Sequence, residues 1–206
     1  MKKIVILGSL ILFLVPPIWA QEKAEAPVWK VGDKWTYKTD TGVELTNETI
    51  GDEKDLFITA RSDKVTLHYD KKDMSCVKAI RDGKEDKAEG GRLKNFYNFP
   101  LFSGKKWTSR YLIYNPAYRM DNDILAEYSV VGVEDVEVPA GKFKAFKVTV
   151  KLNITVLGPR QRQFFGAFYY WWAPDVRGLI KYETDGNSIW EVAKFRKYEL
   201  VSFDLK

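Results

Sequence analysis

The sequence is poor in the residues that carry much of protein chemistry, with one cysteine, Cys76, and one histidine, His68, among 206 residues. A single cysteine excludes an internal disulfide, so the fold must be held by its core. Cysteine and histidine are also too few to build a zinc site. A serine hydrolase triad would need His68, and the sequence has no G-x-S-x-G motif to accompany it. We therefore predict no catalytic residue, no metal site and no cofactor.

The sequence also lacks a dense block of one charge. Its formal net charge is +5, and acidic and basic residues are interspersed over most of its length. This pattern argues against nucleic-acid binding, which needs a basic patch or stripe. Asp121 and Asp123 are spaced as in some calcium loops, but the glycine and the terminal glutamate of an EF-hand are missing. We interpret this segment as a solvated loop.

Long apolar runs are missing except at the start of the chain. Lys2 and Lys3 precede an apolar segment from Ile4 to Val15, and the small residue Ala20 follows. This is the pattern of a secretory signal peptide, and the apolar run is shorter than the roughly 20 residues of a membrane-spanning helix. We predict a signal peptide at residues 1–20, cleaved near Ala20, and a periplasmic or secreted protein. An uncleaved anchor in the inner membrane is the alternative.

Segments with helical periodicity are scarce, whereas aromatic residues are abundant and Gly or Pro recurs at short intervals. From Phe146 to Thr155, apolar and polar side chains alternate, which predicts a strand with one buried face and places Lys147 and Lys151 on the surface. We predict an all-β fold: a curled antiparallel sheet that forms a barrel or half-barrel of about ten to twelve short strands. The predicted strands include residues 42–50, 54–60, 64–70, 75–81, 127–138, 146–155, 164–172, 179–184 and 190–204.

The domain organisation follows from composition. Residues 21–28 are polar and alanine-rich, and we predict a disordered leader there. Residues 29–206 follow as a single β domain, because Gly90-Gly91 breaks the chain only locally and no clear linker exists. Gly32-x-Lys-Trp-Thr36 and Gly104-x-Lys-Trp-Thr108 match at four of five positions. The domain could thus consist of two pseudo-repeated halves, with chance similarity as the alternative.

An aromatic run from Phe164 to Trp172 has no polar face, because aromatic residues occupy both its even and its odd positions. Either this strand is central in the core, or its second face lines a cavity for an apolar or ring-bearing ligand. Both interpretations stay open from the sequence. In the second case the predicted ligand-binding residues are Phe168, Tyr169, Tyr170, Trp171 and Trp172.

Several short motifs occur in an order that is typical of a known group. They are Val31-Gly32-Asp33-Lys34-Trp35-Thr36-Tyr37, Pro100-Leu101 with Gly104-Lys105-Lys106-Trp107, Val138-Pro139-Ala140-Gly141-Lys142-Phe143, and Tyr170-Trp171-Trp172-Ala173-Pro174. The chain resembles a group of uncharacterised exported bacterial β-rich proteins, a domain of unknown function. More distantly it resembles the lipoprotein-carrier half-barrel fold of the bacterial envelope, without that fold's obvious covering helices and lipobox cysteine. The resemblance implies a fold and a compartment, and no catalytic residues.

Three functions are compatible with these observations. The first is a non-enzymatic envelope protein that binds a lipid or another apolar or amphiphilic molecule in a barrel or half-barrel. The second is an interaction or assembly module that docks an envelope protein. The third is a hydrolase that uses a pair of acidic residues, although the spacing singles out no pair. Neither the ligand nor the oligomeric state follows from the sequence.

Overall fold

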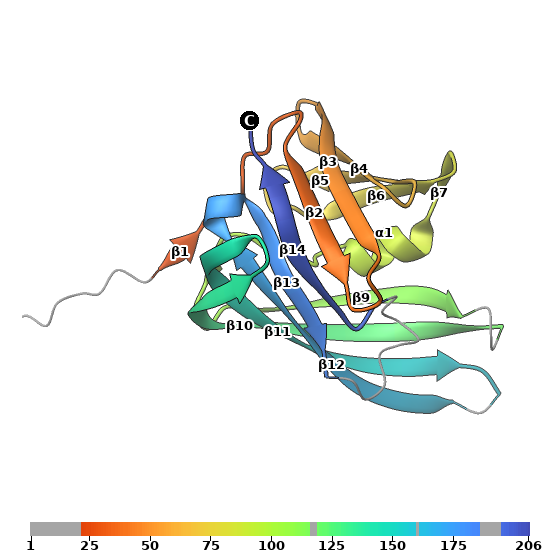
Figure 1. Cartoon of the computed structure of the whole chain (residues 1–206). Helices are drawn as coiled ribbons and strands as arrows, with labels where there is room; N and C mark the ends of the chain where they lie inside the picture. Colours follow the sequence, from red (N-terminus) through yellow and green to blue (C-terminus); the bar gives the residue numbers. More distant parts are fainter. Residues whose placement is uncertain (1–21, 116–118, 160, 186–194) are drawn as a thin grey trace, which may run out of the picture.

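The computed structural model describes residues 22–115, 119–159, 161–185 and 195–206 (Figure 1). The predicted signal peptide at residues 1–20 lies outside these ranges. None of the helices in the described ranges has the length and apolar character needed to span a membrane.

The described residues form one main sheet with short additional elements. They are β1 (Lys23–Ala24), β2 (Lys34–Thr39), β3 (Glu44–Asp52), β4 (Leu56–Arg61), β5 (Val65–Asp70), β6 (Cys76–Arg81), β7 (Lys84–Glu85), α1 (Lys87–Leu93), β8 (Leu101–Phe102), β9 (Lys106–Asn115), β10 (Met120–Val138), β11 (Gly141–Leu157), β12 (Arg162–Ala173), the 3₁₀-helix η1 (Pro174–Val176), β13 (Gly178–Thr184) and β14 (Lys197–Asp204).

The main sheet is antiparallel and has twelve strands in the order β7-β6-β5-β4-β3-β2-β14-β13-β12-β11-β10-β9. It therefore contains two consecutive meanders, β2–β7 and β9–β14, which meet where β14 pairs with β2. The sheet curls, and its two edge strands, β7 and β9, do not pair with each other (Figure 1). The prediction of an all-β, curled half-barrel is confirmed.

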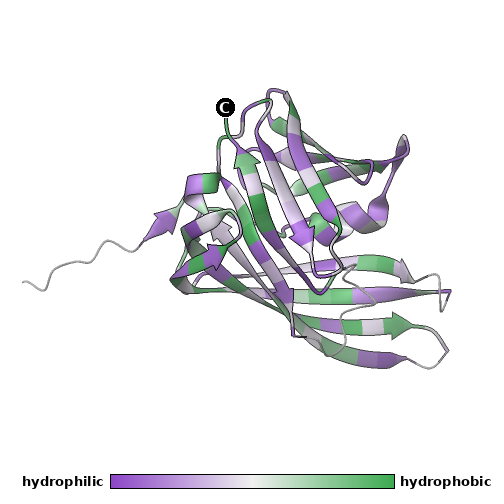
Figure 2. Cartoon of the chain, in the orientation of Figure 1, coloured by the Kyte–Doolittle hydropathy of each residue, from purple (hydrophilic) through white to green (hydrophobic). Residues whose placement is uncertain are grey.

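The β10–β11 hairpin shows how the sequence pattern produces this sheet. The two strands pair along nearly their whole length up to the turn at Pro139 and Ala140. Val148, Val150 and Leu152 are buried on one face, as the alternation predicts. Figure 2 shows apolar and polar residues interleaved along the strands. The predicted pair is present, but β10 and β11 have 19 and 17 residues and are much longer than the short strands we predict.

A bulge lets the far end of this hairpin bend onto another strand. The register of β10 and β11 shifts around Val131, and a bulge of this kind bends and twists its strand. Beyond it, the amide of Ala140 donates to the carbonyl of Leu200 in β14 (3.1 Å). The rings of Phe143 and Phe203 meet edge to face, with centroids 5.9 Å apart. The hairpin thus covers part of the sheet to which it belongs.

The helix α1 lies where the sequence predicts only a chain break. The Asp86 carboxylate caps it by accepting a hydrogen bond from the amide of Glu89 (3.0 Å), and α1 packs against both β6 and β9. A Cβ added at Gly90 would lie 3.5 Å from the backbone nitrogen of Ala79 in β6, and one at Gly91 would lie 3.4 Å from the Cβ of Tyr111 in β9. Both added Cβ atoms would make ordinary van der Waals contacts, so the packing does not require glycine at either position. Through its contacts with β6 and β9, α1 bridges the two margins of the open sheet.

Part of the predicted disordered leader is ordered in the structure. Lys23 and Ala24 form β1, which pairs with Phe102 and Leu101 of β8. Ala24 is buried. Lys23 and Ala24 thus form regular backbone pairs where polarity and alanine content predict disorder.

Candidate functional site

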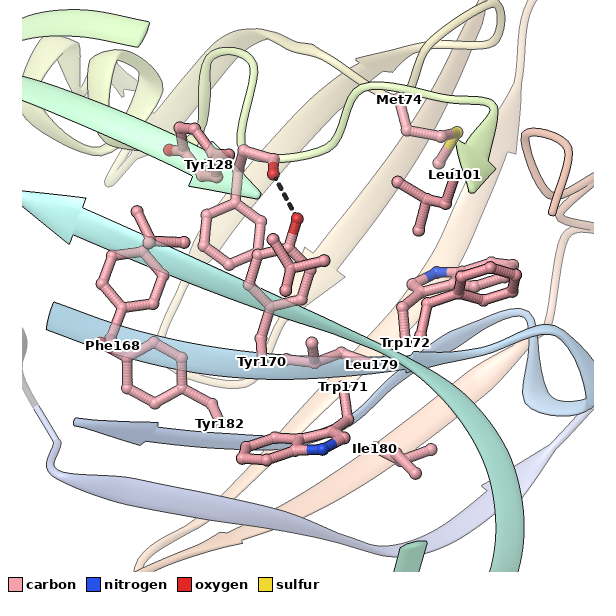
Figure 3. Packing of buried hydrophobic residues seen from close by; sticks show 14 of the residues in the cluster. Met74, Leu101, Tyr128, Phe168, Tyr170, Trp171, Trp172, Leu179, Ile180 and Tyr182 are labelled. Atoms are coloured by element: carbon pink, nitrogen blue, oxygen red, sulfur yellow. Dashed lines mark hydrogen bonds between the residues drawn. The ribbon is translucent and has the colours of Figure 1, made fainter. Parts of the chain in front are cut away.

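The strand β12 divides the predicted ligand-binding residues between two faces of the sheet. Phe168, Tyr170 and Trp172 lie on the inner face, and Tyr169 and Trp171 lie on the outer face, because neighbouring side chains of a strand alternate. Figure 3 shows Tyr170 and Trp172 pointing to one side of β12 and Trp171 to the other. The structure therefore does not bring these residues together as one site.

The inner aromatic residues of β12 pack against the chain's own segment 95–100, which we call the inner plug. The ring of Phe96 stacks on Tyr170 with centroids 4.7 Å apart, and Phe99 meets Trp172 edge to face at 4.9 Å. The Tyr170 hydroxyl donates to the carbonyl of Phe96 (2.9 Å), the dashed line in Figure 3. The inner face at Tyr170 and Trp172 is thus filled by protein.

Two side chains that follow the plug in the chain bond to it, and a third bonds to Lys94, the residue just before it. The indole of Trp107 donates to the carbonyl of Asn95 (2.9 Å), and the Ser109 hydroxyl donates to the carbonyl of Lys94 (2.9 Å). The Lys105 ammonium donates to the side chain of Asn98 (2.7 Å) and to the carbonyl of Pro100 (2.9 Å). Desolvation lowers the pKa of Lys105. The plug is therefore bonded to β9 as well as packed against β12.

On the outer face, Trp171 lies between two lysines and is almost completely covered. The ammonium of Lys147 lies 5.1 Å from its ring centroid, and that of Lys181 lies 4.8 Å away. Its indole donates to Glu134 (2.6 Å), and Lys147 also pairs with Glu134 (3.5 Å). Lys147 lies on the outer surface, as predicted, but it is a packing partner of Trp171 and not a plain solvated residue. The role of Glu134 is missed by sequence reasoning, because it follows the bulge that bends the hairpin.

A second outer feature lies farther along the same strands, where β9–β12 extend past the ends of β2 and β14 (Figure 1). Strand register places five exposed apolar residues on one face, with Leu125 aligned with Phe165 through β11 and Tyr114 aligned with Leu157 through β10. We call this set the outer arm patch. Its members are Leu112, Tyr114, Leu125, Leu157 and Phe165, which are 38 to 67% exposed. The exposed Phe164 lies on the opposite face.

The patch contains charges of both signs. Asp121 and Asp123 lie on the same face of β10, as strand residues and not as the solvated loop we predict. Arg110 of β9 forms an ion pair with Asp123. The hydrogen bond from Arg110 lowers the pKa of Asp123. Asp123 is therefore poorly suited to act as a general acid, and the patch as a whole is apolar with a mixed polar margin.

The residues that the sequence offers for catalysis are not arranged for it. Burial raises the pKa of the Cys76 thiol to about 11, which leaves it protonated and unreactive at neutral pH. Tyr69 aligns with Cys76, so the neighbouring His68 points to the opposite face of the sheet. A Cys–His pair is therefore not formed. Among the described residues, no group of three His, Cys, Asp or Glu side chains could hold a metal ion.

A cluster of buried charges fastens α1 to the rest of the half-barrel. Glu89 accepts hydrogen bonds from Arg61 of β4 and from Arg92 of α1, both at 2.7 Å, and Arg61 also pairs with Asp63 (2.6 Å). Burial alone would raise the pKa of Glu89, but the two guanidinium groups outweigh burial and lower it. The cluster has a structural role, since each charged group in it is paired with a neighbouring group of opposite charge.

Comparisons with known proteins bear on the fold. No protein-family model matches the chain, and no curated protein matches it either. The crystal structure of a candidate lipoprotein from Parabacteroides distasonis superposes with a TM-score of 0.50 at 17% identity, covering 89% of this chain and 100% of that one. The two proteins share a fold. This confirms, at the level of the fold, the resemblance to exported bacterial β-rich proteins.

Two further crystal structures are similar over comparable lengths. A candidate exported protein with a YmcC-like fold from Bacteroides fragilis has a TM-score of 0.40 at 19% identity, covering 88% of this chain and 99% of that one. The hypothetical lipoprotein YmcC from Escherichia coli has a TM-score of 0.44 at 11% identity, covering 87% of this chain and 90% of that one.

Proposed function

We propose that this protein is a non-enzymatic, exported interaction module that docks a protein partner of the cell envelope through the outer arm patch. The observation that carries the proposal is the clustering of large apolar side chains on one face of β9–β12. Leu112 and Tyr114 are each 56% exposed, and Leu125 and Leu157 are each 38% exposed. Contiguous exposed apolar surface of this kind is typical of interaction sites.

The composition of the patch favours a protein over a lipid surface. Aromatic and aliphatic side chains surrounded by a polar rim are characteristic of protein interfaces. Asp121 lies among the apolar residues on this face of β10, whereas Asp123 is neutralised by its ion pair with Arg110. The acidic group of Asp121 opposes binding to an anionic membrane.

The docking proposal can be tested by site-specific photo-crosslinking. A photo-crosslinking amino acid at position 114 is expected to give a discrete adduct with one envelope protein in cells that export the chain. Leu112→Ser should weaken the purified complex about tenfold, since a leucine side chain that is buried on binding contributes apolar contact area that serine cannot replace. Val43, which is 47% exposed and lies outside the patch, provides the matched control position and Val43→Ser the matched variant.

Three outcomes would contradict the proposal. They are the absence of any adduct at position 114, an adduct that contains only a second copy of this chain or a lipid, and equal affinity of the Leu112→Ser and Val43→Ser variants for the captured protein. Analytical ultracentrifugation and vesicle sedimentation identify the second of these outcomes directly.

The exported location is part of the proposal and has its own test. The N-terminal pattern of residues 1–20 supports it, and the structure that shares the fold is described as that of a candidate lipoprotein. Mass spectrometry of the protein from the periplasmic or secreted fraction should give a mature chain that begins near Gln21. A full-length chain in the cytoplasm would contradict export, and a full-length chain in the inner membrane would indicate an uncleaved anchor.

A second candidate function is the binding of an amphiphilic molecule on the inner face, which the inward aromatic wall of Phe168, Tyr170 and Trp172 favours. Such a ligand would have to displace the inner plug. A fluorescent apolar probe should then bind saturably to the wild-type protein, and Phe96→Ala should increase its affinity. If the probe binds neither protein, this candidate is eliminated while the docking proposal is unaffected.

A further inference from the structure

The outer arm patch contains a carboxylate that has no counter-charge of its own. Strand register places Asp121 of β10 directly between Tyr114 of β9 and Leu157 of β11. Tyr114 and Leu157 are 56% and 38% exposed, and Asp121 is exposed as well. In the described part of the chain Asp121 forms no ion pair, although Arg119 is only two residues away. Asp121 is thus a free negative charge flanked by two apolar side chains.

The other acidic residues on this face of β10 have positive charges beside them. Asp123 forms an ion pair with Arg110 of β9. Glu127 lies directly opposite Lys151 of β11 in the register, and opposite charges in such cross-strand positions attract each other. From Asp121 to Glu127, therefore, Asp121 is the carboxylate that has apolar residues on both sides.

This arrangement restricts what can cover the patch. A partner that packs on both Tyr114 and Leu157 also removes the carboxylate between them from water. Burying an unpaired carboxylate is costly, whereas a positive charge brought by the partner offsets the lost hydration. Charge complementarity of this kind also excludes partners that carry an acidic or a purely apolar side chain at the same place.

We propose that the partner carries a basic side chain, flanked by apolar residues, that pairs with Asp121 when the partner docks. This inference rests on the docking function proposed above, and it specifies the chemistry of the partner at the same surface. The ring of Tyr114 provides a second contact, since cations are attracted to the face of an aromatic ring. Arginine suits the position better than lysine, because its planar group stacks on a ring and bonds a carboxylate at two points.

The chain itself holds cations with the same pair of groups. On the outer face of β12, the ammonium of Lys147 lies 5.1 Å from the ring centroid of Trp171 and 3.5 Å from Glu134. The ammonium of Lys71 lies 5.0 Å from the ring centroid of Phe57 and pairs with Asp52. Tyr114 and Asp121 offer a ring and a carboxylate side by side in the same way, but at the surface.

The test uses the protein captured by photo-crosslinking at position 114 and measures its affinity for purified variants of this chain. Asp121→Asn should weaken the complex about tenfold and Asp121→Lys about a hundredfold, because the basic side chain loses its counter-charge in the first and meets a like charge in the second. Glu44→Lys makes the same change of net charge at an exposed carboxylate of β3 outside the patch. It is the matched control and should bind as the wild type does.

Two further measurements separate the charge from the ring. The basic residue of the captured protein is located by mass spectrometry of the crosslinked peptide, and its replacement by glutamate should restore binding to Asp121→Lys. Tyr114→Phe keeps the ring and should bind as the wild type does, whereas Tyr114→Leu keeps only the apolar surface and should bind about threefold more weakly. Circular dichroism checks that each variant is folded.

The results distinguish this inference from the docking function. If Leu112→Ser weakens the complex but Asp121→Lys and Glu44→Lys bind equally well, docking stands and the pairing of Asp121 is overturned. The same holds if charge reversal on the captured protein fails to restore binding to Asp121→Lys. If no protein is captured at position 114, the docking function and this inference are both overturned.

Discussion

At the residue scale, the repeated motif Gly-x-Lys-Trp-Thr forms the same local structure twice. Gly32 and Gly104 both have positive φ angles, 91° and 85°, a conformation that favours glycine. The indole of Trp35 donates to the carbonyl of Val176 (2.7 Å), as that of Trp107 donates to Asn95 (2.9 Å). Each tryptophan thus holds a segment from another part of the chain against the start of its own strand.

The variable second position of the motif anchors the chain with opposite charges. Lys105 binds acceptors of the inner plug, whereas the fully buried carboxylate of Asp33 accepts hydrogen bonds from donors. These donors are the amides of Lys30 (2.9 Å) and Lys206 (2.7 Å) and the guanidinium of Arg177 (2.9 Å). Both copies of the motif thus carry a charged residue at this position, and the groups around each one match the sign of its charge.

Asp33→Ala is expected to lower the free energy of unfolding by about 2–4 kcal/mol. The substitution leaves Arg177 and two amides without their acceptor in a buried site. Urea denaturation followed by tryptophan fluorescence measures the change. Asp204→Ala, at an exposed carboxylate of β14, is the control and should change stability by no more than about 0.5 kcal/mol. Equal effects of the two substitutions would show that Asp33 is not an anchor.

At the scale of the element, the charge cluster around Glu89 makes the attachment of α1 dependent on pH. Because the folded state lowers the pKa of Glu89 below its ordinary value of 4.5, the ionised form stabilises the fold. This contribution is complete above the unfolded pKa and is lost as the pH falls through the lower folded pKa.

We expect the wild-type protein to lose stability more steeply than Glu89→Gln as the pH falls from 5 to 2. At pH 7 the variant should be the less stable protein, since Arg61 and Arg92 lose a buried counter-charge. At the acid end the two should converge. Urea midpoints measured across this range provide the comparison. If the urea midpoints of the two proteins differ by the same amount at every pH, Glu89 stabilises the fold through packing and not through its charge.

A second prediction for α1 concerns its two glycines. Gly90→Ala should stabilise the protein by about 0.5–1 kcal/mol, because alanine has the better helix propensity and the new Cβ would meet Ala79 at an ordinary distance of 3.5 Å. Gly91→Ala should gain less, since its Cβ would lie 3.4 Å from that of Tyr111. Thermal melts of both variants decide the matter, and a loss of stability in Gly90→Ala would contradict this account of the packing.

At the scale of the whole molecule, the two meanders share one core. Buried residues from β2 and β5, such as Trp35 and Leu67, belong to the same cluster as Tyr170 and Val150 of β12 and β11. The pairing of β2 with β14 continues the sheet across the junction. Two halves that shared no core could unfold separately, whereas a common core links their stability.

We therefore expect a single cooperative unfolding transition for residues 29–206. Hydrogen exchange should give the amides of β5 and β11 the same free energy of global opening. Coincident denaturation curves from circular dichroism and fluorescence provide a second measure. Separate transitions would show that the chain consists of two domains. Each half of the pseudo-repeat would then be an independently stable unit.

Much of the fold can be predicted from the sequence where local pattern and burial agree. The alternation from Phe146 to Thr155 predicts β11 because one face of the strand is apolar. Asp82-Gly83 predicts the β6–β7 turn, and both residues have positive φ. By contrast, α1 is not predictable from its glycines. Gly90 and Gly91 lower helix propensity, and α1 is held by contacts with β6 and β9, which are far apart in the sheet.

The candidate sites are less predictable for the same reason. An aromatic strand such as β12 does not reveal what covers each face, and Phe96 of the plug comes from a segment without periodicity. The exposure of Leu112 and Tyr114 depends on β9–β12 extending past the rest of the sheet.

The adjacency of β2 and β14 has a consequence for how the chain can be connected. Lys34 and Asp204 are direct partners in the sheet, so a short linker could join the two ends of the domain without stretching them. New ends could then be opened at the exposed Asp82-Gly83 turn, which would leave the central strand pairs in place. Such a circular permutant should refold and give the circular dichroism spectrum of the native protein. The same fold would then form from a chain in which the strands follow one another in a different order.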